Sequence, residues 1–315
     1  MTSVTTETPS VPPPEGRRSP RRGRRRPWLD WMAVPTLVIL AIVIGYPIVR
    51  AVTLAFTDYN LIGGAAASNF VGAENFQELV DDPVFWQSLR NTFIFTFGSL
   101  AGAGLIGLAL AFATENLGGG WRFLRGLLLT SWAIPIIVVA FLFRFLFLDR
   151  GGLLNSVLLD WGVIDSAIPW ITSTQWSLFS VTIANIWQTT PLFLLVFTAG
   201  LRAVPNEVLE SARVDKTGPW ALAWQIKMPY LRGPAVIVAL IATVENLNSF
   251  PLIWAMTEGG PGYSSSTLAI YLYRLVFDDF ELGYASAIGL VWLAFLLVIA
   301  WWFIRAQRGD QGGRT

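Results

Sequence analysis

The chain has 315 residues, of which 54% are hydrophobic and 14% are charged, and its formal net charge is +1. A soluble protein of this length needs more charge to cover its surface, so the composition indicates a membrane protein. The sequence contains no cysteine and no histidine, which excludes disulfide scaffolds, thiol nucleophiles, Cys/His metal sites and imidazole general bases. We therefore expect no catalytic residue and no metal site.

Residues 1–27 are rich in Pro, Ser, Thr and Arg and carry few apolar side chains, which predicts a disordered cytoplasmic tail. The arginines from Arg17 to Arg26 could bind nucleic acid or anionic lipid. A topology signal beside the first membrane helix explains them better, so we expect no nucleic acid partner. The apolar run that follows is too long for a cleaved signal peptide.

Six apolar runs are long enough to cross a hydrocarbon core of roughly 30 Å, which takes about 20 helical residues. They predict an all-α polytopic membrane domain over residues 28–306, followed by a short cytoplasmic tail at 307–315. Small residues recur within the runs, as at residues 98–113, and small side chains let helices approach closely in lipid. The predicted spans are Trp31–Phe56, Thr92–Thr114, Leu127–Leu148, Trp176–Leu201, Gly233–Thr257 and Tyr284–Ile304.

Lysine and arginine are distributed unevenly among the segments that join these spans. If the N-terminus lies inside, the cytoplasmic segments carry 17 of the 22 basic residues and the three outer loops carry one each. Cytoplasmic loops are enriched in basic residues, so we expect both termini in the cytoplasm. The remaining two, Arg50 and Arg144, fall inside spans near their outer ends, where a long side chain can reach the interface.

The predicted cytoplasmic loop at residues 202–232 has the sequence signals of two short helices. Asn206 can cap the first helix, and acidic residues follow where the helix dipole favours negative charge. Gly218 is expected to break this helix, Pro219 suits the first position of the next one, and Pro229 is expected to end it. The pattern predicts a helical elbow that faces the cytosol. An ordinary loop resting on the membrane surface is the alternative.

The same loop contains, in order, Glu210-Ser211-Ala212, Asp215, Gly218-Pro219 and Ile226-Lys227-Met228-Pro229. It resembles the EAA loop of ATP-binding-cassette importer permeases, in which Glu-Ala-Ala is followed by Asp-Gly-Ala and then by Ile-x-Leu-Pro. This chain departs from the pattern at Lys216-Thr217, where Gly-Ala is usual. In that family the loop supplies a coupling helix that docks in a cleft on the ATPase subunit. The resemblance implies an ATPase-coupling role for Glu210, Ser211, Ala212, Asp215, Gly218 and Pro229.

A second stretch, residues 250–277, resembles the Gly-Gly-Pro region of carbohydrate importer permeases of the maltose type and contains Glu258-Gly-Gly-Pro-Gly262. The two motifs together cover residues 185–289. The resemblance implies the type I importer permease fold in a bacterial cell membrane, with a second similar permease, two ATPase subunits and an external solute-binding protein as partners. The chain has no Gly-x-x-x-x-Gly-Lys-Ser/Thr loop, so we expect ATP and Mg²⁺ on the ATPase and no cofactor on this subunit.

Polar side chains inside the fourth and fifth spans mark candidate binding positions, because a polar group is costly in lipid unless it is paired. Four residues of the fourth span follow the spacing i, i+3, i+4, i+7 and share one helical face. Amides and hydroxyls suit the hydroxyl groups of a sugar, although they could instead only join helices. The candidate substrate-binding residues are Asn185, Gln188, Thr189, Leu192, Glu245, Asn246 and Ser249.

All of these except Glu245 align with sugar-contacting positions of the maltose-type permease. Glu245 could bind a sugar hydroxyl or pair with a partner subunit. We therefore expect a permease subunit that forms the path for a sugar, such as a di- or oligosaccharide, handed over by the external binding protein. A permease for a polyol or glycerol phosphate remains an alternative because close relatives share both motifs. A proton-coupled transporter that uses Glu245 as its proton carrier would leave the elbow unexplained.

The orientation can be tested by cysteine labelling, because the native chain contains no cysteine. Ser166→Cys, in the predicted outer loop, should react with a membrane-impermeant thiol reagent in intact cells. Ser211→Cys, in the predicted cytoplasmic loop, should react only after the membrane is opened. The reverse pattern would contradict the predicted topology.

Overall fold

The computed structural model describes residues 27–62, 69–115 and 120–311, and in these ranges the chain is helical apart from turns, loops and two isolated β-bridges. This confirms the predicted all-α class. The predicted basic tail, except for its last residue, lies outside the described residues. The chain divides into two compact units, Met1–Arg50 and Ala51–Thr315.

The first unit contains one apolar helical run. It consists of α1 (Pro27–Leu40), the π-helical turn η1 (Ala41–Gly45) and the beginning of α2 (Tyr46–Leu54), which continues into the second unit. The 21 residues Val34–Leu54 are long and apolar enough to cross a membrane. Their side chains are exposed almost throughout, as expected of a helix surrounded by lipid.

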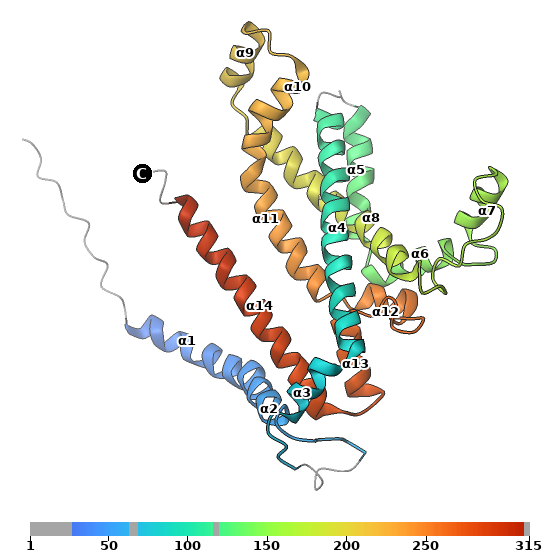
Figure 1. Cartoon of the computed structure of the whole chain (residues 1–315). Coiled ribbons are helices and arrows are strands. Elements are labelled where there is room, and N and C mark those ends of the chain that lie inside the picture. Colours follow the sequence, from blue (N-terminus) through green and yellow to red (C-terminus); the bar gives the residue numbers. More distant parts are fainter. Residues whose placement is uncertain (1–26, 63–68, 116–119, 312–315) are drawn as a thin grey trace, which may run out of the picture. The chain divides into compact units, whose positions relative to one another are not determined.

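Three long helices of the second unit pack side by side (Figure 1): α4 (Pro83–Glu115), α8 (Ser177–Arg202) and α11 (Met228–Leu247). The most extensive packing is between α4 and α8. Glycine makes it possible, since a Cβ atom added to Gly107 of α4 would lie 2.6 Å from the Cβ of Phe193. The predicted role of small residues is thus seen at this contact.

The third predicted span is bent by 103° between α5 (Gly120–Ala133) and α6 (Ile136–Leu146). Pro135 lies at the bend; it has no N–H to donate and disfavours helical geometry in the residue before it. If this pair counts as one span, the described residues hold six spans, consistent with the predicted number.

The fifth predicted span, Gly233–Thr257, is not one helix. The helical run starts earlier, at α10 (Pro219–Ala221), and continues through the π-helix η3 (Leu222–Lys227) into α11. It stops after Leu247, and α12 (Pro251–Thr257) is a separate short helix. The last span is α14 (Leu282–Gln311), whose apolar part ends at Trp301.

Short helices gather at the end of this unit that carries the Gly-Gly-Pro loop; they are α3 (Glu74–Asp81), α12 and α13 (Leu268–Phe277). Asp82, between α3 and α4, joins α13 to α14. Its carboxylate accepts hydrogen bonds from the hydroxyls of Tyr271 at 2.6 Å and Tyr284 at 2.7 Å, and from the N–H of Val84 at 2.8 Å. Burial and the hydrogen bond to Asp82 raise the pKa of Tyr271, so its hydroxyl stays a donor.

Two other connections of this kind hold short elements in place. The side chain of Asn155, in α7 (Leu153–Asp160), donates to the carbonyl of Ile168 at 2.9 Å and accepts from the indole N–H of Trp170 at 2.9 Å. The guanidinium of Arg144, which we expected to reach the interface, donates to the carbonyl of Ala255 in α12 at 3.1 Å.

A buried amide of α4 bonds to the Gly-Gly-Pro loop at several points. The Nδ2 atom of Asn91 lies within hydrogen-bond distance of the carbonyl oxygens of Tyr263, Ser264 and Ser266, at 3.0 to 3.1 Å. The loop turns sharply at Gly259, whose φ of +81° favours glycine. Asn91 therefore helps to hold this loop on α4, together with Thr92, whose hydroxyl accepts from the N–H of Leu268 at 2.9 Å.

We predict that Asn91→Ala lowers the free energy of unfolding by about 1 to 3 kcal/mol, because buried carbonyl groups lose their donor. The measurement is thermal unfolding of the purified protein in detergent. The matched control is Gln87→Ala, one helical turn away on α4 with an exposed side chain. Equal unfolding temperatures for the two variants would contradict the role of Asn91.

Candidate functional site

A polar cluster joins α8 to α11. The Nδ2 of Asn185 donates to the Oδ1 of Asn246 at 2.9 Å, and both side chains are buried. Asn246 lies in the last turn of α11, directly before the helix breaks. The structure thus brings together two of the predicted substrate-binding residues, one from each span.

Gln188, one turn after Asn185 on α8, connects this cluster to the bent span. Its Nε2 donates to the carbonyl of Ile134 at 3.2 Å. Ile134 precedes Pro135 at the bend, where the helical hydrogen-bond ladder is interrupted. A predicted binding residue therefore supports a break in the neighbouring span, and the cluster lies where α8, α11 and the bent pair meet.

Two buried atoms of this cluster have no hydrogen-bond partner in the described part of the chain: Oε1 of Gln188 and Nδ2 of Asn246. An unpaired buried polar atom costs about 1 to 3 kcal/mol, so native proteins rarely keep one without a reason. One of these atoms is an acceptor and the other a donor. A hydroxyl group could satisfy both kinds, because it donates one hydrogen bond and accepts others.

The other predicted substrate-binding residues lie around this cluster at different degrees of burial. Thr189 and Leu192 on α8 are half-buried, and Leu192 packs against an apolar core beside Phe193. Ser249 is half-buried at the break after α11, where its N–H donates to the carbonyl of Asn246 at 3.1 Å. Glu245 is exposed on α11.

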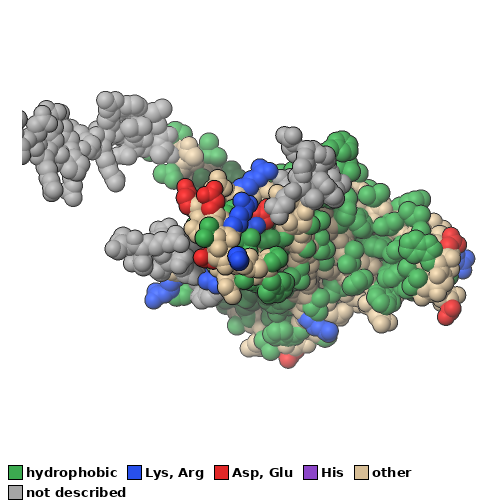
Figure 2. Space-filling view, turned by 90° about the horizontal axis from the view of Figure 1, so that it is seen from above, with side chains coloured by type: hydrophobic (Ala, Val, Ile, Leu, Met, Phe, Trp, Pro, Cys, Tyr) green, Lys and Arg blue, Asp and Glu red, His purple; other side chains and the backbone are tan. Residues whose placement is uncertain are grey.

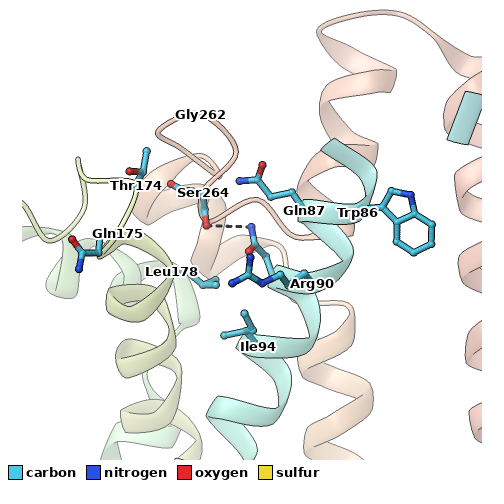
Figure 3. A pocket seen from close by; sticks show the side chains of 10 residues that line it. Trp86, Gln87, Arg90, Ile94, Thr174, Gln175, Leu178, Gly262 and Ser264 are labelled. Carbon is cyan, nitrogen blue, oxygen red and sulfur yellow. Dashed lines mark hydrogen bonds between the residues drawn. The ribbon is translucent and has the colours of Figure 1, made fainter. Parts of the chain in front are cut away.

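A cavity of about 570 Å³ opens at the Gly-Gly-Pro end, between the first turns of α4 and α8 (Figure 3). Amide, hydroxyl and guanidinium groups line it beside Trp86, Ile94 and Leu178, and none of the described residues around it is acidic. The sequence does not predict this cavity, because its lining residues come from three segments that no common motif connects. The polar residues that line it are Gln87, Arg90, Asn91, Thr174, Gln175 and Ser264.

The predicted elbow lies at the other end of the bundle and begins with α9 (Asn206–Val214). Pro205 occupies the cap position and Asn206 is the first helical residue, so the predicted capping role of Asn206 is wrong. Glu207 lies in the first turn, as the charge pattern predicted.

The turn after α9 differs from the sequence prediction. The helix ends before Lys216, not at Gly218, and Lys216 adopts a left-handed φ of +51°. The N–H of Thr217 donates to the carbonyl of Ala212 at 2.9 Å and the N–H of Lys216 to that of Arg213 at 3.1 Å, which is the Schellman pattern of a helix end. A lysine thus holds the position that glycine usually takes.

Proline produces a second difference. Pro219 begins α10, as predicted, but Pro229 lies in the first turn of α11 and the helical run continues to Leu247. Because the run is already helical before Pro229, its missing N–H interrupts the helical hydrogen bonds inside the run and does not end it. The π-helical stretch η3, which ends directly before α11, gives the chain the irregular geometry around Pro229.

The elbow is exposed and carries both charge and apolar surface. Glu210, Ser211 and Asp215 are exposed, whereas Ala212 is buried against the helix end. Val214 and Trp220 are 81% and 75% exposed. Figure 2, which looks onto the elbow, shows acidic and basic side chains gathered there beside hydrophobic ones. Exposed apolar side chains rimmed by charge are typical of a protein interaction surface.

Known proteins are similar to this chain in sequence and in fold. Residues 103–307 match the family described as binding-protein-dependent transport system inner membrane component. The sulfoquinovosyl glycerol transport system permease protein SmoG of Agrobacterium fabrum is 33% identical over 291 residues, which cover 89% of this chain and 93% of that protein. The trehalose/maltose transport system permease protein MalF of Thermococcus litoralis is 29% identical over 280 residues, covering 88% and 92%.

A solved structure has the same fold. It is a chain of a bacterial ABC transporter involved in the import of the acidic polysaccharide alginate, with a TM-score of 0.76 and 21% sequence identity over 89% of this chain and 95% of that one. The predicted importer permease fold is thereby confirmed.

Proposed function

Because this chain belongs to the family of inner membrane components of binding-protein-dependent transport systems, we propose that it forms the membrane path through which an ATP-driven importer takes up a carbohydrate. Members of this family are transport components and not enzymes. Support for a carbohydrate comes from relatives whose names specify sulfoquinovosyl glycerol and trehalose or maltose. The substrate of this chain is expected to be a di- or oligosaccharide. A polyol or glycerol phosphate also presents hydroxyl groups and is the alternative.

The observation that carries the proposal is the buried cluster of Asn185, Gln188 and Asn246, which has an unpaired acceptor and an unpaired donor. It lies beside two helix breaks, at Pro135 and after Leu247. Broken helices expose polar backbone at membrane depth only where it faces protein or lines a cavity. A sugar hydroxyl at this cluster would take up hydrogen bonds that the protein leaves unmade.

The proposed transport cycle follows from the two ends of the bundle. ATP closes a pair of ATPase subunits in the cytoplasm, and the elbow moves with them because it docks on one of the two. The bundle, together with a second permease, then turns the polar cluster towards the outer face, where a solute-binding protein delivers the sugar. Hydrolysis of ATP and Mg²⁺ chemistry take place on the ATPase, and the bundle returns to the inward state.

The proposed orientation has the elbow in the cytoplasm and the Gly-Gly-Pro end outside. The basic residues support it, since 17 of 22 belong to segments that are then cytoplasmic. Both termini are cytoplasmic in this arrangement, and the cell membrane of a bacterium is the proposed location.

For the substrate site, we predict that Asn185→Ala and Asn246→Ala each reduce sugar uptake about five- to 150-fold at concentrations below saturation, because a buried hydrogen-bonding partner of the sugar is lost. Basal ATP hydrolysis and assembly should remain near those of the native protein. The measurement is uptake of labelled sugar into proteoliposomes.

The matched control is Asn248→Ala, since this asparagine is exposed and its side chain donates only to the carbonyl of Val244 one turn earlier. Uptake should be unchanged in the control. Native uptake in both cluster variants would instead assign Asn185 and Asn246 to helix packing. A binding assay of the cognate solute-binding protein on a panel of sugars and polyols identifies the substrate itself.

For the ATPase contact, we predict that Glu210→Lys abolishes transport and detaches or uncouples the ATPase, because losing one partner of a buried interfacial charge pair costs about 2 to 5 kcal/mol. The protein should still insert normally, since the spans are untouched. Co-purification of the ATPase and binding-protein-stimulated hydrolysis are the measurements.

Gln225→Lys is the control for added charge, because Gln225 is exposed in η3 and lies outside α9. It should leave stimulation intact. Full stimulation in Glu210→Lys would show that this residue does not join the permease to the ATPase.

A further inference from the structure

A buried ion pair connects α4 to the helix that follows the elbow. The Nζ of Lys227 lies 2.7 Å from Oε1 and 2.6 Å from Oε2 of Glu115, so both carboxylate oxygens face the ammonium group. The two side chains are only 9% and 19% exposed, respectively. Exposed ion pairs contribute little to stability, whereas the Glu115–Lys227 pair lies largely out of water.

Each charge of the pair compensates for the water that the other has lost. The side chain of Glu115, in the last described turn of α4, is only 19% exposed, and a carboxylate that has largely left water needs an opposite charge or good donors. Lys227 is buried, and an ammonium group leaves water only when an opposite charge or good acceptors replace it. Removal of either partner therefore leaves an uncompensated charge at this junction.

The two helices that the pair joins both lead to the polar cluster. Lys227 ends η3, and the helical run from Pro219 to Leu247 is continuous, so it extends from the elbow to Asn246. Glu115 ends α4, which packs most extensively against α8, the helix of Asn185. π-Helical turns such as η3 are rare and often occur at functional sites. The ion pair therefore links α4 to the start of α11 at the elbow end.

We propose that Glu115 and Lys227 are positioning residues that hold the elbow end of α11 on α4, so that displacement of the elbow moves α4, α8 and α11 as one body. The inference rests on the proposed function, since the elbow transmits motion only if an ATPase docks on it. Without the pair, the elbow moves α11 alone, and ATP is hydrolysed without an equal movement at the polar cluster. The defect is a loss of coupling and not of ATPase binding.

The test measures sugar transported per ATP hydrolysed in proteoliposomes that contain the complete transporter and its binding protein. Lys227→Met and Glu115→Gln should each lower this ratio about tenfold, within the usual range of coupling between distant sites, while the ATPase still co-purifies. Exchange of the two charges, Glu115→Lys with Lys227→Glu, should restore much of the ratio. Arg232→Met, at an exposed position of α11, is the control and should leave the ratio unchanged.

A second, double variant separates the effect of this contact on transport from any effect of the substitutions on folding. Glu115→Cys with Lys227→Cys places a cysteine pair in a chain that has no native cysteine. Bridging the pair with a reducible bifunctional methanethiosulfonate reagent should raise the transport ratio, and reduction of the same sample should lower it again. A general structural role does not predict this reversible change.

Native ratios in Lys227→Met and Glu115→Gln, or a ratio that does not respond to bridging, would overturn the positioning role. Either result leaves the proposed function standing, provided that the native protein takes up sugar with its ATPase bound. Failure of the proposed function has a different signature, because the native protein itself would then neither bind the ATPase nor take up sugar.

Discussion

A polar group inside a membrane span must find its partner within the protein, because lipid offers none. The breaks in this chain show the constraint at work. Where Pro135 interrupts the third span, the carbonyl of Ile134 accepts from Gln188 of a neighbouring helix. Where α11 ends, Asn246 accepts from Asn185. The amides that stabilise the broken helices are also the groups proposed to hold a sugar, so structural support and the proposed substrate recognition fall on one set of side chains.

Close helix packing makes this arrangement possible. Gly107 brings the backbone of α4 against Phe193 of α8, and Gly200 of α8 leaves room for Leu231 of α11. In lipid the hydrophobic effect does not drive helices together, so dispersion contacts across such close surfaces must hold them. The buried pair of Glu115 and Lys227 adds a charged contact at the elbow end. Asp82, with its two tyrosine partners, closes the opposite end of the same unit.

In the elbow, some local features follow from the sequence and others do not. The acidic first turn of α9 and the start at Pro219 follow from local chemistry, and both were predicted from the sequence. The helix end was not. Glycine is the expected residue at a left-handed position, so Gly218 was the natural choice, yet Lys216 adopts that conformation because two backbone hydrogen bonds to Ala212 and Arg213 hold the turn. A non-glycine residue can take this position when the bonds around it outweigh the strain.

Hydropathy by itself predicted the class and a number of spans consistent with the structure, because crossing a membrane requires long apolar runs whatever the packing. Proline, glycine and charge signals predicted the location of the elbow. The two sequence motifs also pointed to the family. The tertiary structure alone decided which polar residues meet. Asn185 and Asn246 are 61 positions apart, and Asn91 lies 175 positions from Ser266. Helical periodicity reports which face a side chain occupies, but not which distant segment packs on that face. The cavity at the Gly-Gly-Pro end and the Glu115–Lys227 pair depend on such distant contacts, and for this reason they appear only in the folded chain.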